Sequence, residues 1–256
     1  MTPTFRLDGS RALVTGGSRG MGFAIARAYA EAGADVILAA RSEADLHAAA
    51  ERLAPTGRRI GVEVIDLARV DAVAPRFEDM LERHGPVDIL VNCAAVASRG
   101  RAIDMPVQEF EATLRLDLSS PFALSQAFAK ARVERGQGGR IVNVASVASL
   151  LAVRTPSTAY ASAKAGMLLM TKQMAYEFAR HGILVNAIAP GYVATDMSKA
   201  FRANAQGEAW RQARVPLERW GEPEDVAGAA LLFASPAGSF ITGAVLTVAG
   251  GLTCVV

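Results

Sequence analysis

The chain has 256 residues, of which 51% are hydrophobic, so it is long enough to bury the core of a single domain, and no stretch of it looks like an interdomain linker. Its 27 Lys and Arg residues nearly balance its 25 Asp and Glu residues and are scattered along the sequence, which argues against a nucleic-acid-binding face. No hydrophobic run reaches the roughly 18 residues that span a bilayer, and the first residues lack a signal-peptide core, so we expect a cytoplasmic protein with no membrane partner.

The first element expected in the chain is a buried strand, Arg11–Thr15, which runs through a glycine turn into a helix at about 23–32. The glycines at Gly16, Gly20 and Gly22 let the backbone turn tightly and approach a pyrophosphate. The N–H groups and the positive dipole end of the next helix would then face the anion. An ordinary strand–turn–helix link can carry the same glycines. The motif indicates a dinucleotide site only together with the alternating strands and helices that follow it.

Strands and helices alternate along the rest of the chain. Further strands are expected at Asp35–Ala40, Ile60–Ile65, Val87–Asn92, Arg140–Ala145, Leu184–Ala189 and Ala244–Val248. Helices are expected at Glu43–Leu53 with Ser42 as N-cap, from about Asp71 to His84, at about Val107–Arg115 and Leu118–Arg135, at Ala159–Arg180 and from Pro223 to about Ala234. Apolar strands joined by helical crossovers predict an α/β fold, with a parallel sheet covered on both faces and ligands beyond the carboxyl ends of its strands.

One segment, at about 191–222, breaks this alternation. It follows the sixth strand and holds Met197, Phe201, Trp210 and Trp220 among polar residues. A position beyond the carboxyl end of a strand is typical of a substrate lid, which we expect here. The alternative is a surface helical insertion with its own small hydrophobic cluster.

Tyr160 and Lys164 lie one turn apart on the same face of an expected helix. A cation about 4 Å from a phenol, at an effective dielectric near 20, is worth up to ~4 kcal/mol, so we expect the pKa of Tyr160 to fall from about 10 towards neutrality. The alternative is a solvated lysine beside a half-buried tyrosine. Ser146 directly follows the fifth strand and would emerge at the same sheet edge as the glycine turn, as a hydrogen-bond donor rather than a nucleophile.

The two cysteines, Cys93 and Cys254, are isolated and lack the spacing of metal ligands. In a reducing compartment they are expected to be packing residues. No metal site is predicted.

Together these residues closely resemble the short-chain dehydrogenase/reductase family over essentially the whole chain. The resemblance rests on Thr15-Gly-Gly-Ser-Arg-Gly-Met-Gly22, Asp66, Asn92-Cys-Ala-Ala95, Ser146, Tyr160-x-x-x-Lys164, Asn186 and Pro190-Gly191. It implies a single dinucleotide-binding catalytic domain over residues 1–256, built on a Rossmann-type, doubly wound, parallel seven-stranded sheet with helices on both faces. The implied reaction is hydride transfer between a nicotinamide cofactor and a carbonyl or secondary alcohol.

The resemblance also assigns roles to single residues. Tyr160 would be the general acid/base, Lys164 would bind the nicotinamide ribose and lower the pKa of the tyrosine, and Ser146 would orient the carbonyl oxygen. Asp66 would meet the adenine, and Asn92 would line the cofactor cleft. The other cofactor-binding residues that it implies are Gly16, Ser18, Arg19, Gly20, Met21, Gly22, Arg41, Leu67, Ala94, Pro190, Gly191, Val193 and, on the carboxamide side, Thr195.

The chain departs from the pattern of the family at several positions. The usual Asn-Asn-Ala-Gly becomes Asn92-Cys-Ala-Ala95, and Ala249 replaces the acid usually found before the last Gly-Gly. The spacing from Ser146 to Tyr160 is one residue longer than usual. We therefore expect the loop at 150–158 to bulge and to alter the substrate pocket.

The most consequential departure is Asp117, which follows Asn92 by 25 residues (117 − 92), the spacing at which the family places the Asn of its catalytic tetrad. In the family this position helps to hold a water bonded to the catalytic lysine, largely through a backbone carbonyl, which Asp also supplies. An ionised Asp117 near Lys164 would offset part of the pull of the cation, so the pKa of Tyr160 would be higher than in an Asn enzyme. The alternative is an Asp turned away as the N-cap of the helix at 118–135.

Two arginines predict the cofactor preference. Arg19 lies in the glycine turn, and Arg41 follows the second strand, where NAD enzymes of this kind present a carboxylate to the ribose 2′-hydroxyl. Two guanidinium groups would instead clamp a 2′-phosphate, so NADP(H) is expected to be preferred over NAD(H). The alternative is that both are solvated surface arginines.

The substrate is expected to be a small molecule. The runs at 187–195 and 219–223 look like those of polyol, sugar-acid and 3-oxoacyl reductases, and they favour a polyol or sugar-acid type. A 3-oxoacyl-thioester reductase is the alternative. In another class, Asp117 leaves room for a non-catalytic NADP-binding scaffold or sensor.

A homotetramer is expected by analogy with the family. The helices at 118–135 and 159–180 also carry apolar residues on more than one face, whereas a helix that covers a sheet needs only one such face. These residues are Phe122, Phe128, Met167, Leu168, Met170 and Met174.

Overall fold

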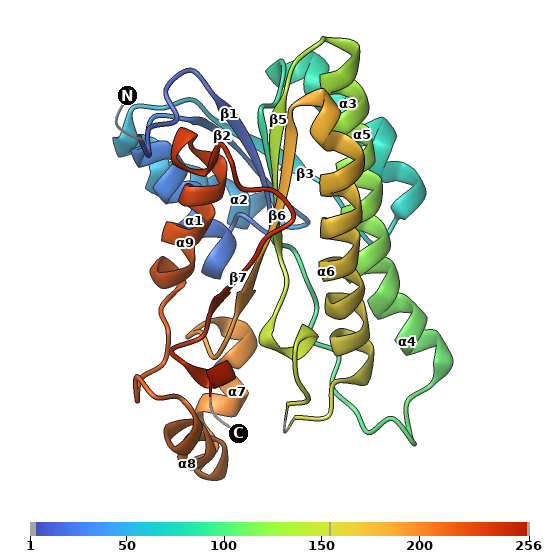
Figure 1. The fold of residues 1–256 in the computed structure, drawn as a ribbon, viewed down its shortest axis with the longest axis vertical. Helices are drawn as coiled ribbons and strands as arrows, with labels where there is room; N and C mark the ends of the chain where they lie inside the picture. The colour runs from blue at the N-terminus through green and yellow to red at the C-terminus, as the bar shows by residue number, and fades with distance from the viewer. Residues whose placement is uncertain (1–3, 154, 255–256) are drawn as a thin grey trace.

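Seven parallel strands form one sheet in the order β3-β2-β1-β4-β5-β6-β7 in the computed structural model, which describes residues 4–153 and 155–254 (Figure 1). The strands are β1 (Arg11–Thr15), β2 (Asp35–Ala40), β3 (Ile60–Val64), β4 (Ile89–Asn92), β5 (Gly139–Val144), β6 (Ile183–Pro190) and β7 (Val245–Val248). Each neighbouring pair is parallel. The predicted Rossmann-type sheet is confirmed.

The predicted helices start and end close to the expected residues, and the segment at 191–222 holds short helices whose bounds were not predicted. The helices are α1 (Gly20–Glu31), α2 (Glu43–Leu53), α3 (Val70–His84), α4 (Val107–Leu114), α5 (Ser120–Glu134), α6 (Thr158–Phe178), α7 (Lys199–Arg202), α8 (Ala205–Arg214) and α9 (Pro223–Ala234). The hydroxyl of Ser42 accepts the N–H of Asp45, so its predicted role as the N-cap of α2 is confirmed. The predicted start of α1 is three residues too late, because the backbone already turns into the helix at Gly20.

The predicted break between the helices at 107–115 and 118–135 was wrong. A π-helical segment, Arg115–Ser119, joins α4 to α5, and the N–H of Ser120 donates to the carbonyl of Arg115, five residues earlier. Pro121 follows directly and has no N–H to offer the carbonyl of Asp117, which favours the wider turn. Such π-helical turns often occur at functional sites.

Helices cover both faces of the sheet, as Figure 1 shows. Side chains such as Val14 and Leu38 pack with α1, α2 and α9 in one core cluster. Their neighbours Leu13 and Ile37 point to the other face and pack with α3, α5 and α6. This alternation accounts for strands that are apolar at nearly every position.

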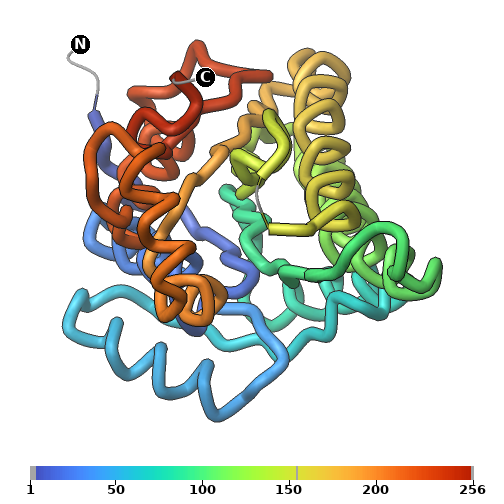
Figure 2. Tube along the Cα trace, turned by 90° about the horizontal axis from the view of Figure 1, so that it is seen from below, coloured from blue at the N-terminus to red at the C-terminus, as the bar shows by residue number. Residues whose placement is uncertain are grey.

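The strand order reverses at β1, because β2 lies on one side of it and β4 on the other. In open α/β sheets the crevice beyond the carboxyl ends of strands at such a point binds the ligand. Figure 2 views this end of the molecule, where the segment after β6, the loop after β5 and the segment after β4 come together. The fold therefore places the candidate site at this end.

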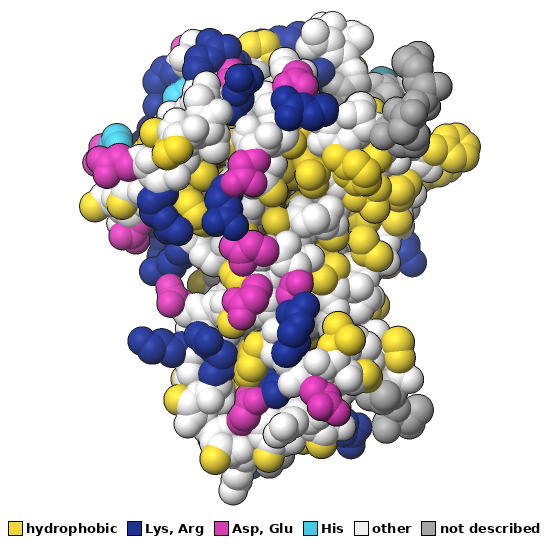
Figure 3. Space-filling model, turned by 90° about the vertical axis from the view of Figure 1, so that its left-hand side faces the viewer, with side chains coloured by type: hydrophobic (Ala, Val, Ile, Leu, Met, Phe, Trp, Pro, Cys, Tyr) yellow, Lys and Arg dark blue, Asp and Glu magenta, His cyan; other side chains and the backbone are white. Residues whose placement is uncertain are grey.

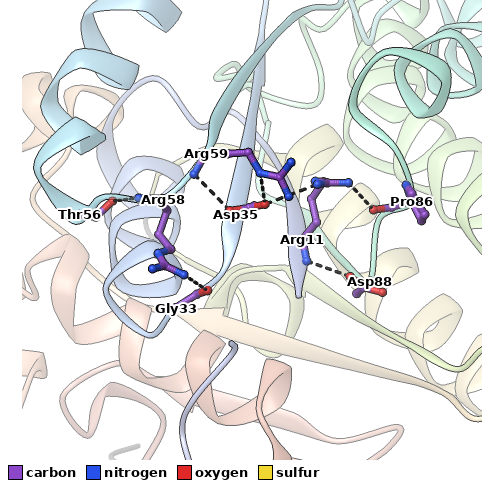
Figure 4. A network of polar contacts seen from close by, with 8 residues as sticks. All are labelled: Arg11, Gly33, Asp35, Thr56, Arg58, Arg59, Pro86 and Asp88. Atoms are coloured by element: carbon purple, nitrogen blue, oxygen red, sulfur yellow. Dashed lines mark hydrogen bonds and ion pairs between the residues drawn. The ribbon is translucent and has the colours of Figure 1, made fainter. Parts of the chain in front are cut away.

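A polar network ties the opposite, amino ends of the strands together (Figure 4). The backbone N–H of Arg11 donates to Asp88 at 2.8 Å, and its guanidinium lies 3.4 Å from Asp35. Arg59, just before β3, pairs with the same Asp35 at 2.8 Å. Burial alone would raise the pKa of Asp35, but the hydrogen bonds from Arg59 and the two positive charges hold it below its usual value.

On the face shown in Figure 3, basic and acidic side chains are interspersed, in keeping with the scattered charges of the sequence. Within the described ranges, none of the helices combines the length and apolar character needed to cross a bilayer. The same residues contain no cluster of His, Cys, Asp and Glu side chains that could hold a metal ion.

Candidate active site

The glycine turn between β1 and α1 keeps the backbone open to a ligand. Gly16 and Gly20 have φ angles of +67° and +57°, which side chains disfavour. A Cβ on Gly22 would lie 2.2 Å from the carbonyl oxygen of Gly16, so only glycine lets the helix start this close to the strand. No side chain caps the first N–H groups of α1, which leaves them available to an anion.

The threonine that ends β1 holds this turn against β4. The hydroxyl of Thr15 donates to the carbonyl of Val91 and accepts the N–H groups of Cys93 and Ala94, at 3.0 and 3.2 Å. The turn and the segment after β4 therefore form two fixed walls of one crevice.

A cleft of about 930 Å³ opens between these walls and the end of β2. Ten predicted cofactor-binding residues line it: Gly16, Ser18, Arg19, Gly20, Met21, Gly22, Arg41, Leu67, Ala94 and Thr195. An extended dinucleotide fits this cleft, because one wall is glycine backbone with uncapped N–H groups and two arginines lie along it. Asp45, Cys93 and Leu116 also line it, and the sequence prediction missed them.

Two predicted cofactor contacts, Asn92 and Asp66, are not among the residues that line this cleft. Asn92 does not line the cleft: it is 2% exposed, and its amide donates to Ser125 and Asn143 at 3.0 and 2.8 Å. As the last residue of β4 it points into the core, and the chain turns to the cleft only at the next residue. Asp66 is exposed outside the cleft lining, and its carboxylate accepts the N–H of Ala68 at 3.1 Å.

Ser146, Tyr160 and Lys164 come together where β5 and α6 meet. Ser146 and Tyr160 line a smaller pocket of about 160 Å³, which shares Met21 and Thr195 with the larger cleft. Lys164 lies behind them and is 1% exposed. Its Nζ donates to the carbonyl of Val144 at 3.1 Å and lies 5.8 Å from the centroid of the Tyr160 ring. The three predicted catalytic side chains thus form one group beside the cleft.

Burial raises the pKa of Tyr160 to about 12, although a hydrogen bond from Ser146 acts in the opposite direction. The negative charge of Asp117 raises it further. The expected fall of this pKa towards neutrality was therefore wrong for the enclosed phenol, because the cost of burying a phenolate is the largest cause of the shift. Burial also lowers the pKa of Lys164, and Asp117 opposes that change.

Asp117 lies in the π-helical segment and is fully buried. Its Oδ1 accepts the N–H of Val96 at 3.0 Å, and its Oδ2 lies 3.9 Å from Nζ of Lys164 with no hydrogen-bond partner in the described part of the chain. Burial raises the pKa of Asp117, and the charge of Lys164 opposes this. The alternative of an N-cap turned away from the site was wrong, because no helix begins at this residue.

The remaining predicted cofactor residues, Pro190, Gly191 and Val193, line the smaller pocket instead of the cleft. Val153 and Thr155 line it as well, so the loop between Ser146 and Tyr160 does shape the pocket. Residue 154 of that loop lies outside the described residues.

The segment at 191–222 contributes Met197, Ser198 and Phe201 to the same pocket. It also has a cluster of its own: the Tyr192 ring stacks on Phe201 at 5.3 Å and meets Trp210 and Trp220 edge-on at 5.6 and 5.7 Å. The segment therefore has the hydrophobic cluster of its own that the alternative expected, and it also lines the pocket.

Arg99 was not found from the sequence, although it follows β4, whose carboxyl end faces the site. Its guanidinium donates to the carbonyl of Met197 at 2.9 Å, so it bridges the segment after β4 and the segment at 191–222. Arg99 lines both the cleft and the smaller pocket.

Residues 16–253 match the model of a family described as enoyl-(acyl carrier protein) reductase. The galactitol 2-dehydrogenase of Rhizobium johnstonii is 40% identical over 257 aligned residues, covering 98% of this chain and 97% of that protein. The 3-oxoacyl-(acyl-carrier-protein) reductase of Vibrio cholerae serotype O1 is 39% identical over 246 residues, covering 96% of this chain and 98% of that protein. A gluconate 5-dehydrogenase of Burkholderia cenocepacia, solved in complex with NADP and tartrate, has a TM-score of 0.93 and 37% identity, covering 98% of each chain.

Proposed function

The chain belongs to the short-chain dehydrogenase/reductase family, whose members are NAD(P)-dependent oxidoreductases, and we propose on this premise that it interconverts a small polyol or sugar acid and the corresponding keto compound with NADP(H). The observation that carries the proposal is the group formed by Ser146, Tyr160 and Lys164, whose two hydroxyl residues line a pocket that adjoins the dinucleotide cleft. Each member of the group has a distinct task.

Tyr160 is the proton donor in the reductive direction. With its pKa raised to about 12, the phenol keeps its proton at neutral pH and can give it to a carbonyl oxygen. Ser146 lines the same pocket and orients that oxygen by a hydrogen bond. Lys164 stabilises the phenolate left behind, since its ammonium lies within 5.8 Å of the ring.

A nicotinamide cofactor, when bound, supplies the hydride in reduction and accepts it in oxidation. The glycine turn and the start of α1 would hold its pyrophosphate, and Thr195 would meet its carboxamide end. Arg19 and Arg41, which both line the cleft, support a preference for NADP(H), because two guanidinium groups suit a 2′-phosphate. The NADP in the Burkholderia cenocepacia relative supports the same choice.

The substrate class rests on the pocket and on the relatives. Eight residues that carry hydroxyl groups line the pocket, which suits a polyhydroxylated compound. One relative is named for galactitol, and the Burkholderia cenocepacia enzyme is named for gluconate and was solved with tartrate. The Vibrio cholerae relative keeps 3-oxoacyl-thioester reduction as the second candidate. A non-catalytic NADP-binding scaffold has less support, because Ser146, Tyr160 and Lys164 lie together as a catalytic site would need.

Three further features belong to the same proposal. The segment at 191–222 acts as the substrate lid of a single catalytic domain. The protein assembles as a homotetramer and works in the cytoplasm.

The test is oxidation of NADPH and NADH against a panel of keto-sugars, keto-sugar acids, 3-oxoacyl esters and diketones, with the reverse reaction run on the matching alcohols. We expect turnover with the first two classes and faster turnover with NADPH. Faster turnover of 3-oxoacyl esters would instead support the second candidate, a 3-oxoacyl-thioester reductase. Tight NADPH binding without turnover of any compound would favour the scaffold.

A further inference from the structure

The smaller pocket, lined by Ser146 and Tyr160, is the proposed substrate pocket. Among the residues that the structure describes, it holds one charged side chain, Arg99. Neither Asp nor Glu occurs among the described residues that line it. The other polar residues of the lining carry hydroxyl groups, among them Ser98, Thr155 and Ser198. The pocket therefore offers one positive charge and several neutral hydrogen-bonding groups.

The guanidinium of Arg99 is only partly used by the protein. One N–H group donates to the carbonyl of Met197. No carboxylate of the described residues lies within ion-pair distance of it, whereas Arg19 lies 3.7 Å from Asp196 and Arg101 lies 3.3 Å from Asp104. Arg99 is exposed to solvent, and at the wall of the pocket it keeps hydrogen-bond donors and a positive charge that no carboxylate of the described residues neutralises.

An arginine in this state favours a particular kind of ligand. The planar guanidinium binds a carboxylate through two parallel hydrogen bonds, and such charge-assisted bonds are about twice as strong as neutral ones. A neutral polyol would leave the charge of Arg99 without a counter-charge. A hydroxy acid would supply that counter-charge and could place its hydroxyl groups against the serines and threonines of the lining.

We propose that Arg99 binds the carboxylate of the substrate, so that the preferred substrate is an open-chain polyhydroxy acid and not the neutral polyol of the same length. The inference rests on the proposed function, because it needs the reacting carbon to lie between Ser146 and Tyr160. Its bond to Met197 gives Arg99 a second task, which is to hold the segment at 191–222 beside the bound acid.

The experiment compares D-gluconate with D-glucitol, which differ only in having a carboxylate or a CH₂OH group at one end. We expect wild-type kcat/KM with NADP⁺ to be higher for gluconate. Arg99→Gln should lower kcat/KM for gluconate by about 10- to 100-fold, the usual effect of losing a charge-assisted hydrogen bond, and should lower the value for glucitol by clearly less, because only the bond to Met197 is lost there. Arg99→Lys should recover part of the loss, because it restores the charge without the planar fork.

Two arginine variants serve as controls. Arg101→Gln removes the same charge two residues away, outside the pocket lining, and should leave both substrates unaffected. Arg154→Gln tests the arginine that the sequence places between Val153 and Thr155, at a position outside the described residues. If Arg154→Gln and not Arg99→Gln abolishes the preference for the acid, the assignment to Arg99 is overturned.

Other outcomes are also decisive. If Arg99→Gln lowers kcat/KM equally for gluconate and glucitol, Arg99 does not bind the carboxylate and only holds the segment at 191–222, which overturns the inference. A wild-type preference for glucitol would overturn the inference and leave the proposed function intact. If neither compound is turned over, the proposed substrate class fails, and calorimetric binding of gluconate to the NADP⁺ complex decides the inference. Binding that Arg99→Gln abolishes would support it, and no binding would overturn it.

Discussion

The Oδ2 atom of Asp117 lies 3.9 Å from Nζ of Lys164, and the two side chains are 0% and 1% exposed. A buried carboxylate thus lies beside the lysine whose Nζ is 5.8 Å from the centroid of the Tyr160 ring. Because its negative charge raises the pKa of Tyr160, Asp117 makes the phenolate harder to form, which would keep Tyr160 protonated as the proposed proton donor. The negative charge of Asp117 distinguishes this site from that of a family member with Asn at the same position.

Replacing Asp117 by Asn should therefore move the pH profile of alcohol oxidation to lower pH. Oxidation needs the phenolate as proton acceptor, and removal of the negative charge lowers the pKa that limits it. The measurement is kcat/KM for oxidation as a function of pH, with Asp104→Asn, an exposed site, as the control. An unchanged or upward-shifted profile in a folded Asp117→Asn protein would leave Asp117 with a purely structural role.

The same position should also contribute to stability in a way that separates two substitutions. Both Asn and Ala leave the charge of Lys164 without its partner, but Asn can still accept the N–H of Val96, whereas Ala cannot. Breaking a buried pair typically costs 3–5 kcal/mol, so Asp117→Ala should lower the free energy of unfolding by about 3 kcal/mol or more, and Asp117→Asn by about 1 kcal/mol less, the contribution of the hydrogen bond. Chemical denaturation at pH 7 measures both, and equal losses would show that the bond to Val96 does not contribute to stability.

Tyr160→Phe should lower kcat by at least about 100-fold, because it removes the proton donor and keeps the ring. NADPH affinity should stay nearly unchanged. The matched control is Tyr176→Phe, which makes the same change at an 82% exposed site on the same helix. Substantial turnover in Tyr160→Phe, with cofactor binding intact, would assign the acid/base role to another group.

Arg19→Ala and Arg41→Ala should each raise the KM for NADPH by about 10-fold or more and leave the KM for NADH nearly unchanged, because each removes charge-assisted hydrogen bonds to a 2′-phosphate. Arg180→Ala, at an exposed position outside the cleft lining, is the control. The decisive quantity is the ratio of kcat/KM for the two cofactors. A wild-type ratio near one, or equal effects on both cofactors, would show that the arginines do not select NADP(H).

Light scattering at micromolar concentration should give the mass of a tetramer. Of the apolar residues that the sequence places on more than one face of the two long helices, Phe128, Met167, Leu168 and Met174 are buried inside the subunit. Exposed apolar side chains nevertheless remain on α5 and α6: Phe122 at 46%, Leu169 at 70% and Tyr176 at 82%.

If these side chains form a subunit contact, Leu169→Glu should reduce the measured mass. Ile103→Glu, at an 81% exposed loop position, should not. A monomeric mass for the wild-type protein would refute the tetramer itself. A tetrameric Leu169→Glu protein would instead place the contact on another surface.

Much of this protein could be predicted from its sequence because the relevant signals are local. Strand and helix periods, the glycine turn and the one-turn spacing of Tyr160 and Lys164 each depend on residues close together in the chain. Parallel strands then bring their carboxyl ends to one edge, so Ser146 and the glycine turn could be placed at the same site from topology alone.

Only the tertiary structure decided where individual side chains point and how deeply they are buried. Asn92 turns into the core because Ser125 and Asn143, far away in the sequence, offer it hydrogen bonds. Burial raises the pKa of Tyr160, and Asp117 lies buried in the π-helical segment that joins α4 to α5. Desolvation depends on every segment packed around a group, and local sequence patterns carry no measure of that packing.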